Sequence, residues 1–172
     1  MIGLEEDCLL ALVNERNMVE GSVSLSEYKK NPSKYNVFCI RVILMTEERE
    51  FILSPGSFFE ESMYDTSYCT IIKYKEDYAT AFERIKKALP NVDLHFIMQY
   101  KSDDEKYNLN VRLYLGKQNI EEAKANQERV VLYPSDIVTD DIIENNILFS
   151  EIDFIKEGIF SVIDSNNIKN YY

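Results

Sequence analysis

The chain has 172 residues, 45% of them apolar and 28% charged, so a single domain can bury a core without a metal ion or a disulfide to hold it together. Its 30 Asp and Glu residues outnumber its 19 Lys and Arg residues, which gives a formal net charge of −11. A charge of that sign repels nucleic-acid phosphates and anionic membrane surfaces, and it attracts basic proteins and cations. The composition therefore predicts one acidic domain over residues 1–172, with a basic protein as partner and neither nucleic acid nor membrane.

The cysteines Cys8, Cys39 and Cys69 are odd in number, and no two of them form a Cys-x-x-Cys pair. This arrangement predicts buried free thiols and argues against a disulfide framework or a zinc site. The N-terminus lacks a basic stretch followed by an apolar one, and no apolar run approaches the ~20 residues that cross a bilayer. The sequence therefore predicts a cytoplasmic protein.

Two helices are expected in the first thirty residues. Acids followed by apolar residues at helical spacing predict a helix over 4–16. Ser24 or Ser26 is expected to cap a short second helix that ends before Pro32, because the residue before proline avoids helical geometry.

Three strands are expected next. Residues 37–45 are apolar on both faces apart from Arg41, which is typical of a central strand. Shorter β-rich runs over 50–53 and 68–75 predict two more strands, with an irregular segment over 58–67 between them.

The middle of the chain carries the clearest patterns. Apolar residues at helical spacing over 76–89, followed by Pro90, predict a helix. Alternation over 94–101 and 107–115 predicts a hairpin with one buried face. That face is expected to hold Phe96, Met98, Leu109, Val111 and Leu113. A turn at 102–105 would set His95 opposite Arg112 and Gln99 opposite Asn108.

Towards the C-terminus, Asn119 and Glu122 resemble a capping box for a helix to about residue 129. A short strand over 130–133 and helices over about 140–148 and 151–164 follow, and the tail after about 165 is expected to fray. The whole pattern predicts an α+β fold: a mainly antiparallel sheet of about six strands, built from hairpins, with helices packed on it.

Catalytic motifs are scarce. The sequence lacks GxxxxGK[ST], GxGxxG, GxSxG and HExxH, and its only histidine is His95. His95 could act as a general base, but the expected register supplies no acid to orient it, so an ordinary strand residue is the favoured interpretation. No residue is assigned as catalytic, cofactor-binding or metal-ligating, and the chain is predicted not to be an enzyme.

Three further features have local explanations. Asp93 with Gln99-Tyr-Lys101 superficially resembles the PD-(D/E)xK nucleases, but Asp93 and Lys101 are expected ~26 Å apart on one strand. The pairs Asp103–Asp104 and Asp140–Asp141 suit a turn and a helix start. Arg41 is expected to meet a carboxylate or reach solvent, and an ion pair is favoured over an anion site.

One segment combines aromatic residues with acids, a composition that is enriched at protein interfaces. The residues predicted to bind a partner are Phe58, Phe59, Glu60, Glu61, Tyr64 and Asp65. In size and charge the chain resembles immunity proteins, so the favoured function is an inhibitor that occludes the active site of a basic, nuclease-type toxin. The alternatives are a metal-assisted hydrolase of an unrecognised class and an acidic adaptor subunit.

Overall fold

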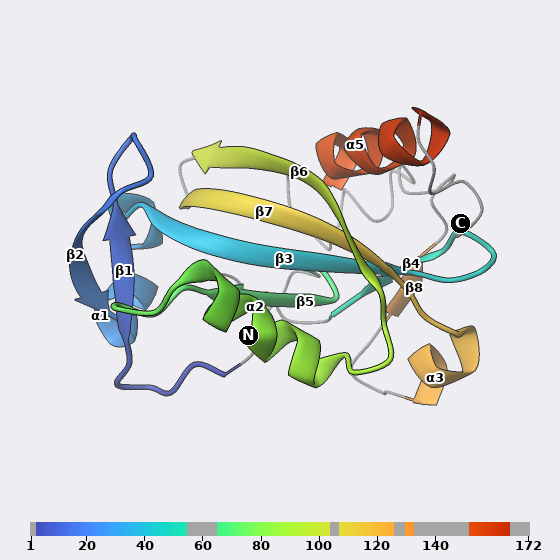
Figure 1. Cartoon of the computed structure of the whole chain (residues 1–172), viewed down its shortest axis with the longest axis horizontal. Coiled ribbons are helices and arrows are strands. Elements are labelled where there is room, and N and C mark those ends of the chain that lie inside the picture. The colour runs from blue at the N-terminus through green and yellow to red at the C-terminus, as the bar shows by residue number, and fades with distance from the viewer. Residues whose placement is uncertain (1–2, 55–64, 104–106, 126–129, 133–151, 166–172) are drawn as a thin grey trace. The chain divides into compact units, whose positions relative to one another are not determined.

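A computed structural model describes residues 3–54, 65–103, 107–125, 130–132 and 152–165 (Figure 1). The chain divides into two compact units. The first comprises Met1–Arg41, Tyr68–Asn91 and Gln99–Leu113, and the second comprises Val42–Ser67, Val92–Met98 and Tyr114–Tyr172. The single domain expected from the sequence stays a prediction.

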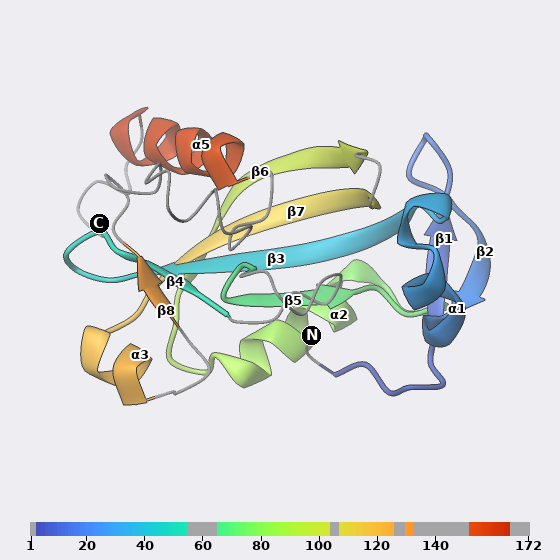
Figure 2. The ribbon, with the colours of Figure 1, turned by 180° about the vertical axis from the view of Figure 1, so that it is seen from behind.

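The first unit combines a hairpin, a short strand and two helices. These elements are β1 (Leu9–Val13), β2 (Val19–Ser24), α1 (Leu25–Lys30), the 3-10 turn η1 (Pro32–Lys34), β5 (Tyr68–Ile71) and α2 (Tyr78–Ala88). The helix α1 lies beside the β1–β2 hairpin, and α2 lies along β5, as both views show (Figure 1 and Figure 2). Three long strands give residues to both units: β3 (Val37–Met45), β6 (Leu94–Asp103) and β7 (Asn108–Lys117).

The second unit contains the remaining short elements, β4 (Phe51–Leu53), α3 (Ile120–Ala125), β8 (Val130–Leu132) and α5 (Ile152–Ser165). The strand β4 pairs antiparallel with β3 and with β8. The fully buried Phe51 stacks on Phe160 of α5, with ring centroids 6.1 Å apart. Ile159 and Ile163 of α5 are also buried, so one face of this helix belongs to the core of the unit.

The sheet has eight strands where about six were expected, and it is mixed, with some parallel pairing beside the antiparallel pairs. Its main path runs β2-β1-β3-β4-β8, with β5 and β7 also paired to β3, and β6 paired to β7. The strands β3 and β7 run in the same direction, as the colours of Figure 1 show. The α+β class is confirmed. No helix in the described part of the chain is long and apolar enough to cross a membrane.

The helix predicted over 4–16 is wrong, because β1 and β2 form an antiparallel hairpin there, with Leu10 opposite Val23. The other edge of β1 is also bonded, since the Ala11 N–H donates to Ile72 O at 3.0 Å. Hydrogen bonds on both edges of β1 outweigh the helical spacing of its apolar residues. Asn14 makes the turn, accepting from two backbone N–H groups within the next four residues.

The other helices begin and end largely where the sequence predicts. Ser24 caps α1 by accepting from the Glu27 N–H at 3.2 Å, and Asp77 caps α2. Towards the C-terminus, α3 and α5 confirm two more predicted helices, although α3 ends at Ala125. The helix predicted over about 140–148 and the tail after 165 lie outside the described residues.

The hairpin of β6 and β7 is confirmed, but the face and register predicted for β6 are wrong. Phe96 is 52% exposed and packs edge-to-face on Tyr114, while Ile97 is buried. Gln99 accepts a hydrogen bond from Arg112 at 3.2 Å, so it does not face Asn108 as expected. On β7 the predicted core face is confirmed, since Leu109, Val111 and Leu113 are fully buried.

Candidate functional site

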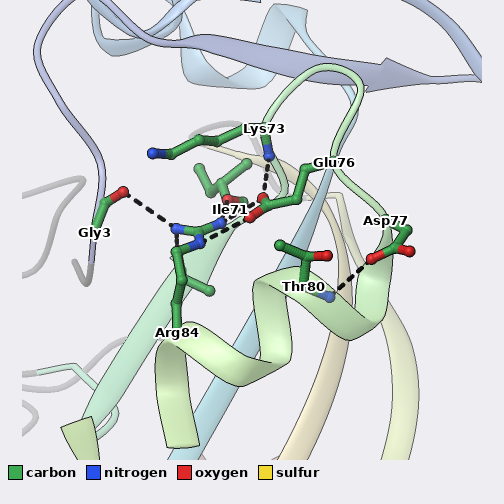
Figure 3. Close-up of polar contacts among 8 residues, drawn as sticks. Gly3, Ile71, Lys73, Glu76, Asp77, Thr80 and Arg84 are labelled. Atoms are coloured by element: carbon green, nitrogen blue, oxygen red, sulfur yellow. Dashed lines mark hydrogen bonds and ion pairs between the residues drawn. The ribbon is translucent and has the colours of Figure 1, made fainter. Parts of the chain in front are cut away.

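A polar cluster joins the start of α2 to the end of β5 (Figure 3). Arg84 and Glu76 form a two-pronged ion pair, in which Nε donates to Oε1 at 3.0 Å and Nη2 to Oε2 at 2.6 Å. Only 16% of the Arg84 side chain and 10% of the Glu76 side chain are exposed. A pair with this geometry, shielded from water, is far stronger than a surface pair.

The remaining donors of Arg84 also have partners. Nη1 donates to the Thr70 hydroxyl at 2.7 Å and, at 3.4 Å, to the Gly3 carbonyl oxygen. Nη2 donates to the Ile71 carbonyl oxygen at 3.0 Å (Figure 3). One guanidinium therefore ties together the N-terminal segment, β5 and α2.

The turn between β5 and α2 places Glu76 for this role. Lys75 has a left-handed φ of 67°, and the Lys73 N–H donates to Glu76 Oε2 at 2.9 Å. Asp77 then caps α2, and hydrogen bonds from Thr80 hold the pKa of its carboxyl below the usual value. The turn is thus fixed by two acids, both of which bond to backbone N–H groups.

These contacts decide what the cluster can do. The Glu76 carboxylate already accepts hydrogen bonds from Arg84 and from the Lys73 N–H. Its role is therefore to hold the start of α2 in position. The inner face of α2 is apolar, with Ala81 and Ile85 fully buried and Leu89 buried at its end. Among the described residues, no three His, Cys, Asp or Glu side chains gather where they could hold a metal ion.

A second cluster surrounds Arg41 in the first unit. The guanidinium is 1% exposed, and its Nη1 donates to the Tyr100 hydroxyl at 3.2 Å. Burial raises the pKa of the neighbouring Tyr28 hydroxyl, which stays protonated. Of the two outcomes expected for Arg41, contact with solvent is excluded by this burial.

The residues predicted to bind a partner are only partly described. Phe58, Phe59, Glu60, Glu61 and Tyr64 lie outside the described residues. Asp65 is 3% exposed, and its Oδ1 accepts from the Thr66 N–H at 2.7 Å. The partner-binding prediction therefore stays untested.

The remaining candidates lie along β6. His95 is half-buried on the strand, and Asp93 immediately precedes the strand on which Lys101 lies. Arg112 contacts Gln99 and not His95, which removes the cross-strand neighbour expected for the histidine. Asp104 and the Asp140–Asp141 pair are outside the described residues.

Sequence reasoning predicted the helix over 76–89 but missed the pairing of Glu76 with Arg84. No local signal could have found it, because Glu76 precedes the helix and the pair is eight residues apart. The partners Thr70 and Ile71 come from a strand whose position depends on the rest of the sheet.

No protein-family model and no curated protein matches the chain. Among solved structures, its fold resembles DR0079 from Deinococcus radiodurans, with a TM-score of 0.65 and 14% identity over 87% of this chain and 97% of that one. A solution structure of the same protein, which names it a hypothetical Nudix protein, matches with a TM-score of 0.41 and 17% identity over 69% and 72% of the chains.

Two other structures are more distant. The Ap4A hydrolase of C. elegans has a TM-score of 0.47 and 13% identity, over 73% of this chain and 98% of that one. MutT of methicillin-resistant Staphylococcus aureus, described as a Nudix hydrolase, has a TM-score of 0.47 and 11% identity, over 74% and 98%.

These likenesses correct the functional interpretation made from composition. The chain shares its fold with DR0079, and this likeness contradicts both the immunity-protein interpretation and the expectation of no enzymatic activity. Net charge misled here, because it describes solubility and long-range attraction and carries no information about the fold.

Proposed function

We propose that this chain is a hydrolase that cleaves a nucleotide-like phosphoanhydride with water. The observation that supports the proposal is the likeness to DR0079, which extends over 87% of this chain and 97% of that protein. A fold alone does not define a reaction, so the proposal depends on a direct test of turnover.

Within this proposal Glu76 and Arg84 are positioning residues. Their ion pair holds the start of α2 against the end of β5, and no donor of Arg84 points away from the protein groups it already contacts.

Three free cysteines, two of them buried, suit a reducing compartment. They support a cytoplasmic location as part of the same proposal.

The test is an assay of the purified full chain against a panel of phosphoanhydrides: Ap4A, a nucleoside diphosphate sugar and a nucleoside triphosphate. Each is incubated in ¹⁸O-labelled water with Mg²⁺, with Mn²⁺ or with EDTA, and products are separated by chromatography and weighed by mass spectrometry. We expect one ¹⁸O atom in a phosphate product of at least one substrate. Binding of these compounds without turnover would contradict the proposal.

A contaminating hydrolase is excluded with a destabilised variant. Arg84→Lys loses the planar fork and should lower the melting temperature of the protein. The temperature at which activity is lost must fall by the same amount as the melting temperature. Activity that survives unfolding of the variant would come from another protein, and the hydrolase proposal would then have no support.

A further inference from the structure

Arg112 on β7 is held in place by two neighbours in the first unit. Its Cζ lies 4.1 Å from the centroid of the Tyr78 ring, and its Nε donates to Gln99 Oε1 at 3.2 Å. Tyr78 itself stacks on Phe82, with centroids 6.1 Å apart and planes 13° from parallel. The guanidinium is therefore held by two contacts before any ligand arrives.

The charge of Arg112 contrasts with that of Arg84. Arg84 shares its charge with Glu76 and donates to three other oxygens. For Arg112, by contrast, no carboxylate and no acceptor for Nη1 or Nη2 is found among the residues that the structure describes. The side chain is half-buried, so water screens its charge only in part.

This arrangement is chemically specific. A cation–π contact with the Tyr78 ring uses no N–H group as a hydrogen-bond donor to oxygen, and the Gln99 contact uses only Nε. The two terminal nitrogens then remain to make parallel hydrogen bonds to the oxygens of a phosphate or a carboxylate. The chain has 30 acidic residues, yet the two described neighbours that orient Arg112 are a glutamine and a tyrosine, which carry no negative charge.

We propose that Arg112, with Gln99 and Tyr78 as positioning residues, is an oxyanion-binding site for a small molecule. The oxyanion is a phosphate or a carboxylate group, which a guanidinium edge binds in the same way. The inference goes beyond the proposed hydrolase activity and does not depend on it, because it concerns binding and is measured without turnover.

The Arg112 Nε–H group gives a direct readout, since its hydrogen bond to Gln99 slows exchange with water. The full chain is titrated with inorganic phosphate, pyrophosphate and acetate at constant ionic strength, and the arginine Nε–H signals are followed by NMR. We expect a saturable shift of the Arg112 signal, and comparison of phosphate with acetate identifies the preferred oxyanion.

Arg112→Gln should weaken binding of the preferred anion by about tenfold or more, because both terminal contacts and the charge are lost. Arg112→Lys keeps the charge without the fork and should weaken it less. Arg16→Gln, on the exposed β1–β2 turn, removes the same charge elsewhere and should leave the affinity within about twofold.

Three results would overturn the inference. One is the absence of a saturable shift of the Arg112 signal with any of the three anions. Another is equal weakening by Arg112→Gln and Arg16→Gln, which would show nonspecific attraction. The last is unchanged affinity in an Arg112→Lys or Arg112→Gln protein whose backbone spectrum shows an intact fold. A hydrolase assay that fails does not bear on any of these.

Discussion

The ion pair of Glu76 with Arg84 can be removed from either side. Glu76→Ala takes away the carboxylate, and Arg84→Ala takes away the guanidinium. The double variant removes both, so the three proteins and the wild type form a cycle that isolates the energy of the pair. Tyrosine fluorescence and far-UV circular dichroism report unfolding, because the chain has 12 tyrosines and no tryptophan.

The structure sets the expected size of the effect. Breaking a buried ion pair from one side costs about 3–5 kcal/mol, because the partner charge is left uncompensated. Arg84 keeps the Thr70 hydroxyl and the Ile71 carbonyl as acceptors, which favours the lower end for Glu76→Ala. We expect a loss of about 3 kcal/mol, a coupling energy of about 2 kcal/mol in the cycle, and a melting temperature lower by roughly 6–12 °C.

A surface pair in the same chain provides the control. Lys117 and Glu47 approach to 3.8 Å, but their side chains are 41% and 70% exposed. The corresponding cycle should give a coupling energy below about 0.5 kcal/mol. Urea unfolding curves for the wild type and the six variants yield both numbers. Equal coupling in the two cycles would refute the reasoning that burial and two-pronged geometry make the Glu76 pair strong.

Two further predictions concern local structure. The lowered pKa of Asp77 means that its capping contribution is present above the usual Asp pKa of about 3.9 and is lost as the pH falls through the folded value. Asp77→Ala should therefore lower the urea midpoint at pH 7 and change it less at pH 3; an equal difference at both values would contradict the cap. A Cβ at Gly116 would lie 2.6 Å from Val92 Cγ1, so Gly116→Ala should destabilise by about 1–3 kcal/mol. At Gly21 the nearest atom would be 3.9 Å away, so Gly21→Ala serves as the control, and urea curves showing the same loss for both would exclude the packing explanation.

The parts of the fold that were predictable are those whose signals are local. A serine cap before Pro32 placed α1, and apolar residues at helical spacing closed by Pro90 placed α2, so both helices could be predicted from sequence. The run over 37–45 is apolar on both faces, and β3 is indeed buried along almost its whole length.

The β1–β2 hairpin was unpredictable because its signal is not local. Leu9, Leu12 and Val13 have a spacing that suits a helix and a strand equally well. The partner strand β2 is mostly polar, and β1 gains its second set of bonds from Ile72, about sixty residues away. Long-range pairing of this kind leaves no trace in a window of ten residues.

The register of β6 failed for a related reason. Phe96, Met98 and Tyr100 alternate with His95 and Ile97, and both sets contain apolar residues. Hydrophobicity therefore does not choose the buried face, and the length of the turn decides it. The strand β6 extends to Asp103, past its expected end at 101, and β7 runs from Asn108 to Lys117, past its expected end at 115.

The candidate sites were the least predictable features. The residues that contact Arg84 come from separate segments of the chain, and Arg112 on β7 contacts Tyr78 of α2 and Gln99 of β6. Each residue in them is ordinary in its own sequence context. Only the packing of the strands and α2 shows that Arg84 pairs with a carboxylate and that Arg112 contacts a glutamine and a tyrosine.

The strand β2 ends the main path of the sheet and pairs only with β1 among the described strands, so its outer edge can accept another strand. Met18 and Val19 at its start are both 57% exposed, which adds apolar surface to this edge. A second copy that paired there would bring together two chains that each carry a net charge of −11. Mutual repulsion therefore keeps copies apart in dilute salt. Concentrated salt screens that repulsion. We therefore expect self-association through this edge at high protein concentration and high ionic strength.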